Sequence, residues 1–148
     1  MMKLSTMSAI MLTCNPQHES PLADALVTRW FTEHGPVRFF RISANGLFTF
    51  DAGGQRYFLR CNHAEERTVE YLHAELAFLR HLAAAGIRVA LPVTSVNGHE
   101  VESLQTEVGL LHAVVFAAMP GLREKLTGAL QHYRDVFAVL ASTSLPSR

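Results

Sequence analysis

The chain has 148 residues, and its 13 Lys and Arg balance 13 Asp and Glu. This length predicts one domain with a sizeable core, and 49% apolar against 18% charged residues argues against intrinsic disorder. The net charge of zero gives no electrostatic reason to expect a nucleic-acid or acidic-membrane partner.

Cysteine content and hydropathy argue against a disulfide-rich, zinc-binding, secreted or membrane-spanning protein. Cys14 and Cys61 are too few for a disulfide scaffold and have no zinc-binding spacing, so Cys61, at the end of an apolar run, is interpreted as a buried thiol. No run of 18 apolar residues is present, and the first 14 residues do not match a signal peptide. We therefore expect a cytoplasmic protein with no membrane span and no metal site.

The first half of the chain predicts one helix and three strands. Residues 21–33 have helical apolar spacing, with Ser20 as N-cap and Pro21 at the first helical position. Three strands follow, separated by a turn at 43–46 and by a hairpin turn at 51–54 that contains Gly-Gly. The strands are expected at residues 37–42, 47–50 and 56–61.

The second half predicts a long helix and further strands. The helix is predicted to begin around Ala64 and is clearest over 69–85, with Gly86 closing it. Residues 87–96 are extended around Pro92, an Asn-Gly hairpin turn leads into 99–104, and 110–116 is an apolar strand. A last amphipathic helix is predicted over 129–141. The order indicates an α+β fold with an antiparallel meander interrupted by one helix.

Glu75 is out of place in the long helix. Its helical neighbours Tyr71, Phe78, Leu79 and Leu82 are all apolar, so its carboxylate lies on or beside the core-facing stripe. Burying an unpaired carboxylate costs several kcal/mol, which predicts a nearby cation. The alternative is that Glu75 lies at the edge of the stripe and reaches water.

Arg60 is the candidate partner. Strand alternation places Arg56, Phe58 and Arg60 on one face of the third strand. Arg60 lies 15 residues before Glu75 in the sequence. A strand-borne cation held by a helix-borne carboxylate is how protein-kinase-like folds direct positive charge at ATP phosphates.

Four fragments in order carry a family resemblance. They are R-Y-F-L-R (56–60), Y-L-H-A-E-L-A-F-L-R-H-L (71–82), A-A-G-I-R-V-A-L-P-V-T-S-V-N-G (84–98) and H-A-V-V-F-A-A-M-P-G (112–121). Together they resemble the N-terminal lobe of the aminoglycoside phosphotransferase/choline kinase-like family. The resemblance implies a five-stranded antiparallel sheet with one long packing helix, flanked by N- and C-terminal helices. It divides the chain into an N-terminal extension (1–36), the nucleotide-binding lobe (37–121) and a linker helix with a tail (122–148).

The resemblance also implies roles for particular residues. Arg60 would contact phosphate and Glu75 would be its ion-pair partner. Leu47 and Phe58 would pack on the adenine faces, although apolar strand residues like these and Phe116 are also ordinary core residues. The loop over the phosphates would comprise Ser43, Ala44, Asn45, Gly46 and Leu47. The hinge offering backbone groups to the adenine edge would comprise Phe116, Ala117, Ala118 and Met119.

The family's catalytic signature is not found in this sequence. Its C-terminal lobe carries a His-x-Asp motif with an Asn five residues after the Asp, and a later metal-binding Asp. The only aspartates are Asp24, Asp51 and Asp135, and Asp135 lies in the helical pattern with Leu140 five positions on. We therefore expect a truncated ATP-binding lobe of a small-molecule kinase that is not catalytic alone, with Mg²⁺ bound only when a complete C-terminal lobe is present. The hydroxyl acceptor of full-length relatives would be an aminoglycoside, choline or a homoserine-like compound.

Two other interpretations remain open. The chain could be a non-catalytic binding or interaction module that retains the lobe fold, or an unrelated α+β domain in which Arg60 and Glu75 do not meet. A lone lobe would also expose its inter-lobe face, where Phe116, Met119, Leu122 and Leu126 lie. That face predicts self-association or a partner that supplies the second lobe.

Overall fold

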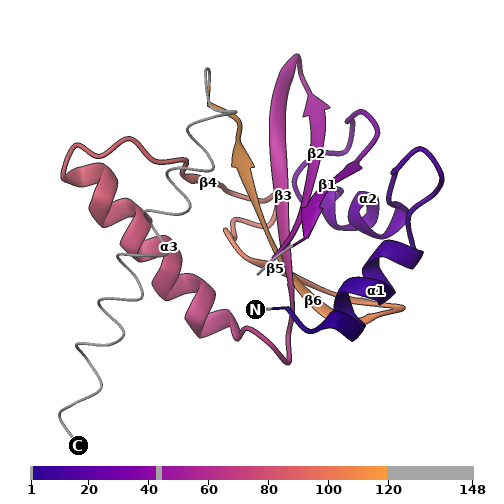
Figure 1. Cartoon of the computed structure of the whole chain (residues 1–148). Coiled ribbons are helices and arrows are strands. Elements are labelled where there is room, and N and C mark those ends of the chain that lie inside the picture. The colour runs from indigo at the N-terminus through magenta and orange to yellow at the C-terminus, as the bar shows by residue number, and fades with distance from the viewer. Residues whose placement is uncertain (1, 43–44, 120–148) are drawn as a thin grey trace, which may run out of the picture. The chain divides into compact units, whose positions relative to one another are not determined.

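The structure, a computed structural model, describes residues 2–42 and 45–119. Three helices and six strands follow the predicted α+β order (Figure 1). They are α1 (Leu4–Leu12), α2 (Pro21–Val27), β1 (Arg38–Ile42), β2 (Gly46–Ala52), β3 (Gln55–His63), α3 (Val69–Ala84), β4 (Pro92–Val93), β5 (Glu102–Thr106) and β6 (Gly109–Ala117). The predicted helix at 129–141, the linker at 122–148, Leu122 and Leu126 lie outside the described residues.

The sheet has six strands where five were expected. Its order is β1-β2-β3-β6-β4, with β5 also paired to β6, and all pairs are antiparallel. The two-residue β4 lies opposite Val115 and Phe116, whereas β5 lies opposite residues 109–113 of the same strand. Two short strands thus pair with successive parts of one strand, because Pro92 lacks the N–H that a longer ladder would need.

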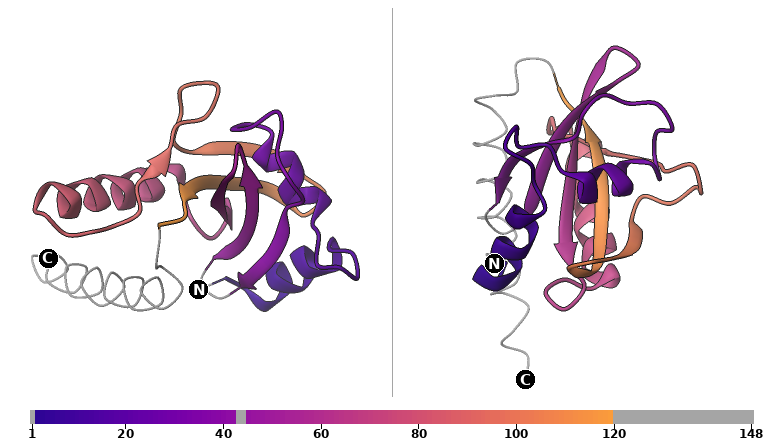
Figure 2. Two further views of the ribbon diagram at one scale, coloured as in Figure 1. Left: turned by 90° about the horizontal axis from the view of Figure 1, so that it is seen from above. Right: turned by 90° about the vertical axis from the view of Figure 1, so that its right-hand side faces the viewer.

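Helices cover both faces of the sheet (Figures 1 and 2). One face packs against α1 and α2 in the larger core cluster, which includes Ile10, Leu26, Phe48 and Leu59. The other face, which we call the α3 face, meets that helix in a smaller cluster. This cluster contains Leu72, Leu76, Val101 and Val114, with Tyr71, Leu79 and Phe116 packed against it.

The N-terminal helices differ from the prediction. Ser20 caps α2 as expected, accepting a hydrogen bond from the Ala23 N–H at 3.1 Å, but the helix ends at Val27 instead of residue 33. Tertiary contacts explain the early end, because the Trp30 indole donates to the Val93 carbonyl at 2.8 Å and the Val96 N–H donates to the Arg29 carbonyl at 2.9 Å. Helix α1 was not predicted at all.

Helix α3 and the turns follow their local signals closely. Thr68 caps α3 by accepting from the Tyr71 N–H at 3.1 Å, and Gly86 has a φ of +85° just after the helix. Gly53 and Gly54, at φ +56° and +78°, form the β2–β3 hairpin turn. The turn at Gly98 is present, but β5 starts at Glu102, three residues later than predicted. Within the described residues, no helix is long and apolar enough to cross a membrane.

Candidate functional site

Arg60 and Glu75 form a buried ion pair between β3 and α3. The Arg60 Nη1 donates to Glu75 Oε1, and the two residues are only 7% and 6% exposed. The predicted pairing is confirmed, and the alternative in which Glu75 reaches water is wrong. Since a carboxylate at this depth is held by its cation, the pair fixes the direction in which the guanidinium points.

The guanidinium retains donors that no described residue satisfies. Its carbon lies 5.4 Å from the centroid of the Phe116 ring, a cation–π contact. Arg60 Nε and Nη2 are buried and have no hydrogen-bond partner among the described residues. Buried N–H groups of a charged side chain are costly to leave unpaired, so they mark a position where an anionic acceptor would be stabilised.

Strand register places the predicted adenine-contacting residues on the α3 face beside Arg60. Leu47 of β2 and Val114 of β6 lie directly opposite Arg60, and Phe116 lies opposite Phe58. Helix α3 covers Val114, which is 1% exposed, whereas Leu47, Phe58 and Phe116 remain partly exposed. The structure thus brings the three apolar residues together with the cation on the α3 face, where each of the three remains partly exposed.

The loop expected over the phosphates is described only at its end. Ser43 and Ala44 lie outside the described residues. Asn45 accepts a hydrogen bond from Asn62 Nδ2 at 2.6 Å. Packing favours glycine at position 46, because a Cβ there would lie 2.9 Å from the Cys61 sulfur.

The hinge residues continue from the end of β6. The Ala118 N–H donates to the Arg56 carbonyl at 2.9 Å, so this donor is already used within the sheet. Tyr57 and Ala117 lie opposite each other, and this bond joins the residues next to them. Tyr57 and Ala117 are therefore a non-hydrogen-bonded pair of the antiparallel ladder. The N–H and C=O of Ala117 therefore point to the other edge of β6, beyond the first residue of β4. Met119 is described and partly exposed, and its contact with a base remains a prediction.

A polar group at the far end of the α3 face was not predicted. Asn62 lies opposite His112 across β3 and β6, and the Ser103 hydroxyl lies 2.7 Å from His112 Nδ1. Both Asn62 and His112 are buried, and burial lowers the pKa of His112. The sequence signal for this group was an Asn and a His within apolar strands. Polar side chains are rarely buried in such strands unless they have hydrogen-bond partners.

The remaining acidic and apolar features lie elsewhere. Asp24 lies 3.6 Å from His34, and Asp51 pairs with Arg56 in the β2–β3 hairpin, while Asp135 is outside the described residues. A cavity of about 410 Å³ is lined by Trp30, Phe31, Thr32, Glu33, Ala52, Gly53, Tyr57 and Val96, and includes none of the predicted site residues. Among the described residues, no cluster of His, Cys, Asp and Glu is placed to hold a metal.

An antiparallel sheet whose third strand carries a cation paired to a glutamate on the following long helix is the arrangement of a kinase-like fold. Comparison with known families agrees. Residues 38–143 match the phosphotransferase enzyme family, and the chain belongs to that family. The interpretation as an unrelated α+β domain is therefore excluded.

Relatives and solved structures include several small-molecule kinases. Over 87 residues the chain is 33% identical to amicoumacin kinase of Bacillus subtilis (strain 168), a match that covers 59% of this chain and 26% of that protein. A structure of amicoumacin kinase in complex with AMP-PNP, Ca²⁺ and Ami is 25% identical with a TM-score of 0.51, covering 80% of this chain and 30% of the other.

Two further structures share the fold. A microcompartment-associated aminopropanol kinase is 20% identical, with a TM-score of 0.60 over 67% of this chain and 31% of the other. A spectinomycin phosphotransferase is 12% identical, with a TM-score of 0.50 over 72% of this chain and 31% of the other. The chain therefore spans about a third or less of the length of each relative.

Proposed function

We propose that this chain is the ATP-binding lobe of a small-molecule kinase, and that it orients the nucleotide for transfer of the γ-phosphoryl group to a hydroxyl acceptor. The observation that carries the proposal is the buried Arg60 guanidinium, held by Glu75 through one nitrogen while two others have no partner among the described residues. We also propose a cytoplasmic location, because ATP is available there.

The side chains present fit a nucleoside triphosphate. The Arg60 donors would bind phosphate oxygens, and the charge on Glu75 keeps the guanidinium from turning toward solvent. The partly exposed Leu47, Phe58 and Phe116 would pack on the base, next to the phosphate position. The adenine edge would meet backbone groups of Ala117 and Met119. When bound, ATP supplies the phosphoryl group, and Mg²⁺ would be held by residues of a C-terminal lobe.

A binding experiment with matched variants tests this role. Nucleotide binding to the 148-residue chain would be followed by NMR titration into the millimolar range. The double variant Arg60→Met/Glu75→Leu removes both charges together, which keeps the fold because no lone charge is left buried. We expect it to lose ATP binding. Arg56→Met is the control, since Arg56 lies on the same face of β3 but is exposed and paired with Asp51.

Nucleotide binding tests the proposed site. If the wild-type chain binds no adenine nucleotide, or if both variants bind ATP as well as the wild type, the proposed site is wrong. Phosphoryl transfer is a separate readout. We expect no turnover with any hydroxyl acceptor by this chain alone, because the His-x-Asp motif of the family's C-terminal lobe is not found in this sequence. Robust turnover would contradict that expectation.

A further inference from the structure

Strand β1 contains a β-bulge at Phe40. Phe39 lies opposite Phe48 and Arg41 lies opposite Leu47, so two steps along β1 match one step along β2. Without the extra residue, strand alternation would place Arg41 on the same side as Phe39, which packs in the larger core cluster on the α1 and α2 side. The bulge instead brings Arg41 into register with Leu47, on the α3 face.

Register then aligns two arginines across three strands. Arg41, Leu47 and Arg60 occupy neighbouring positions on β1, β2 and β3. Adjacent strands are about 4.8 Å apart, so the two arginine backbones are separated by about 10 Å, with the partly exposed Leu47 between them. Long flexible side chains on such positions can reach one ligand from two sides.

Arg41 differs from the other arginines of this face, because none of the described residues is its acidic partner. Arg56 pairs with Asp51, whose carboxylate also interacts with Arg38, and Arg60 pairs with Glu75. Within residues 2–42 and 45–119, none of the ion pairs involves Arg41, and its side chain is exposed.

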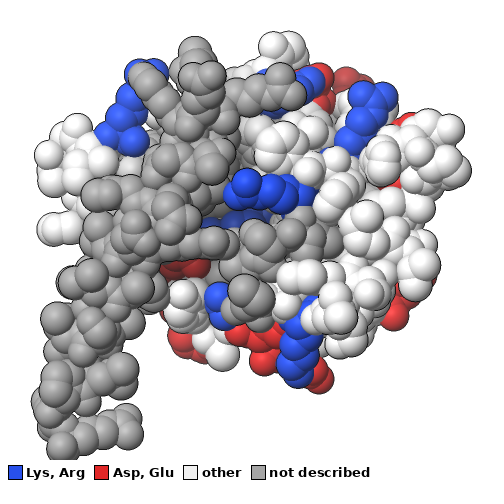
Figure 3. Space-filling view, in the orientation of Figure 1, with Lys and Arg blue, Asp and Glu red and all other residues white. Residues whose placement is uncertain are grey.

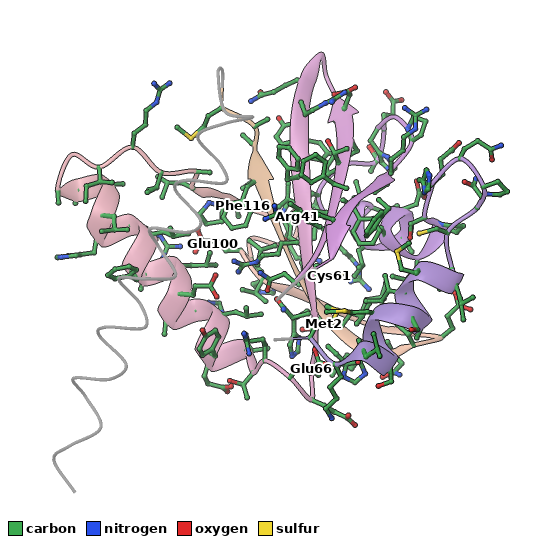
Figure 4. All side chains as sticks on the ribbon, in the orientation of Figure 1. Met2, Arg41, Cys61, Glu66, Glu100 and Phe116 are labelled. Atoms are coloured by element: carbon green, nitrogen blue, oxygen red, sulfur yellow. The ribbon has the colours of Figure 1, made fainter. Side chains whose placement is uncertain are left out.

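The Arg41 side chain lies on the face of the sheet seen in Figures 3 and 4. Basic side chains are visible at the middle of the face in Figure 3. In Figure 4, the Arg41 side chain extends from β1 across the front of the sheet in the direction of Phe116. Phe116 contacts the Arg60 guanidinium, and strand register places Arg41 and Arg60 on the same face of the sheet.

We infer that Arg41 is a second phosphate-binding residue, directed at the phosphate chain of a nucleoside di- or triphosphate by the bulge at Phe40. This inference rests on the proposed nucleotide site. Arg60 is fixed and its charge is balanced by Glu75, whereas Arg41 is exposed and belongs to no ion pair among the described residues. A polyphosphate would satisfy both, and a nucleoside without phosphates would contact neither.

The test compares ATP, ADP and adenosine binding to the full chain and to two matched variants. Arg41→Gln removes the proposed contact, and Arg38→Gln removes an equally exposed arginine from the same strand and the same face. We expect Arg41→Gln to weaken ATP and ADP binding about tenfold, the usual effect of one charge-assisted hydrogen bond, and to leave adenosine binding unchanged. Arg38→Gln should change all three by less than about twofold, and Arg41→Lys should restore part of the loss.

Each result distinguishes this inference from the proposed function. If ATP binds and depends on Arg60, but Arg41→Gln behaves like Arg38→Gln, the role of Arg41 is refuted and the nucleotide site stands. An equal loss of adenosine binding in Arg41→Gln would also refute it, since that result indicates a general disturbance of the site. Absence of all nucleotide binding by the wild-type chain would overturn the site and the inference together.

Discussion

Replacement of Glu75 by Ala should strongly destabilise the folded lobe. The change leaves the Arg60 guanidinium in a position that is only 7% exposed, with none of its described hydrogen-bond acceptors remaining. Removing one member of a buried ion pair costs roughly 3–5 kcal/mol because the other charge stays desolvated. That is a large share of the 5–15 kcal/mol by which native domains are typically stable. Glu75→Gln keeps the side-chain volume and isolates the effect of the charge.

Urea denaturation followed by circular dichroism would measure the free energy of unfolding. Arg80→Ala provides the control on the same helix, because Arg80 pairs with Glu100 but its side chain is 47% exposed. An exposed pair contributes only about 0–1 kcal/mol. A loss below about 0.5 kcal/mol for Glu75→Ala, or one equal to that of Arg80→Ala, would show that Glu75 is solvated and would refute the reasoning. The double variant Arg60→Met/Glu75→Leu should regain most of the stability.

Three further predictions follow from packing and titration. Gly46→Ala should lower the free energy of unfolding by about 1–3 kcal/mol in urea denaturation, because the new Cβ would lie 2.9 Å from the Cys61 sulfur. Adding Cys61→Ala to the same chain should recover most of that loss. Burial raises the pKa of Cys61 to about 12, so iodoacetamide at about pH 8 should modify Cys14 but not Cys61 in the folded chain, as read by mass spectrometry. Because burial lowers the pKa of His112, the unfolded chain binds a proton at this residue more readily than the folded chain does. The free energy of unfolding should therefore fall below about pH 6.5. His112→Gln should reduce this pH dependence, as measured by urea titrations at several pH values.

The parts of the fold that local patterns predicted are those with strong local determinants. Helix α3 has a Thr68 cap, an apolar stripe and Gly86 after its end. Its observed end agrees with the prediction to within one residue, although it starts at Val69 and not around Ala64. The β2–β3 hairpin needs positive φ at Gly53 and Gly54, which the sequence supplies. The Arg60–Glu75 pair was predictable for a similar reason, since each charge interrupts an apolar face and only pairing makes both tolerable.

Other features depend on contacts between distant segments. Helix α1 leaves Leu4 and Leu12 exposed, so it has no clear apolar stripe, and its start is instead held by bonds from the Lys3 N–H and the Thr6 hydroxyl to Glu66, about 60 residues away. Helix α2 ends early because Trp30 is bound to the carbonyl of Val93. No local pattern contains the partner in either case.

The bulge at Phe40 shows that the candidate site also depends on both local patterns and contacts between distant segments. Alternation alone assigns Arg41 to the side of Phe39, and only pairing with β2 reveals that one extra residue moves it to the side of Arg60. Cap, turn and charge signals that act over a few residues were enough to predict most helices and strands and the buried Arg60–Glu75 pair, and the four ordered fragments carried the family resemblance. The tertiary structure decided helix ends, the sharing of β6 by two short strands and which charges share a face, because register is set by partners that lie far along the chain.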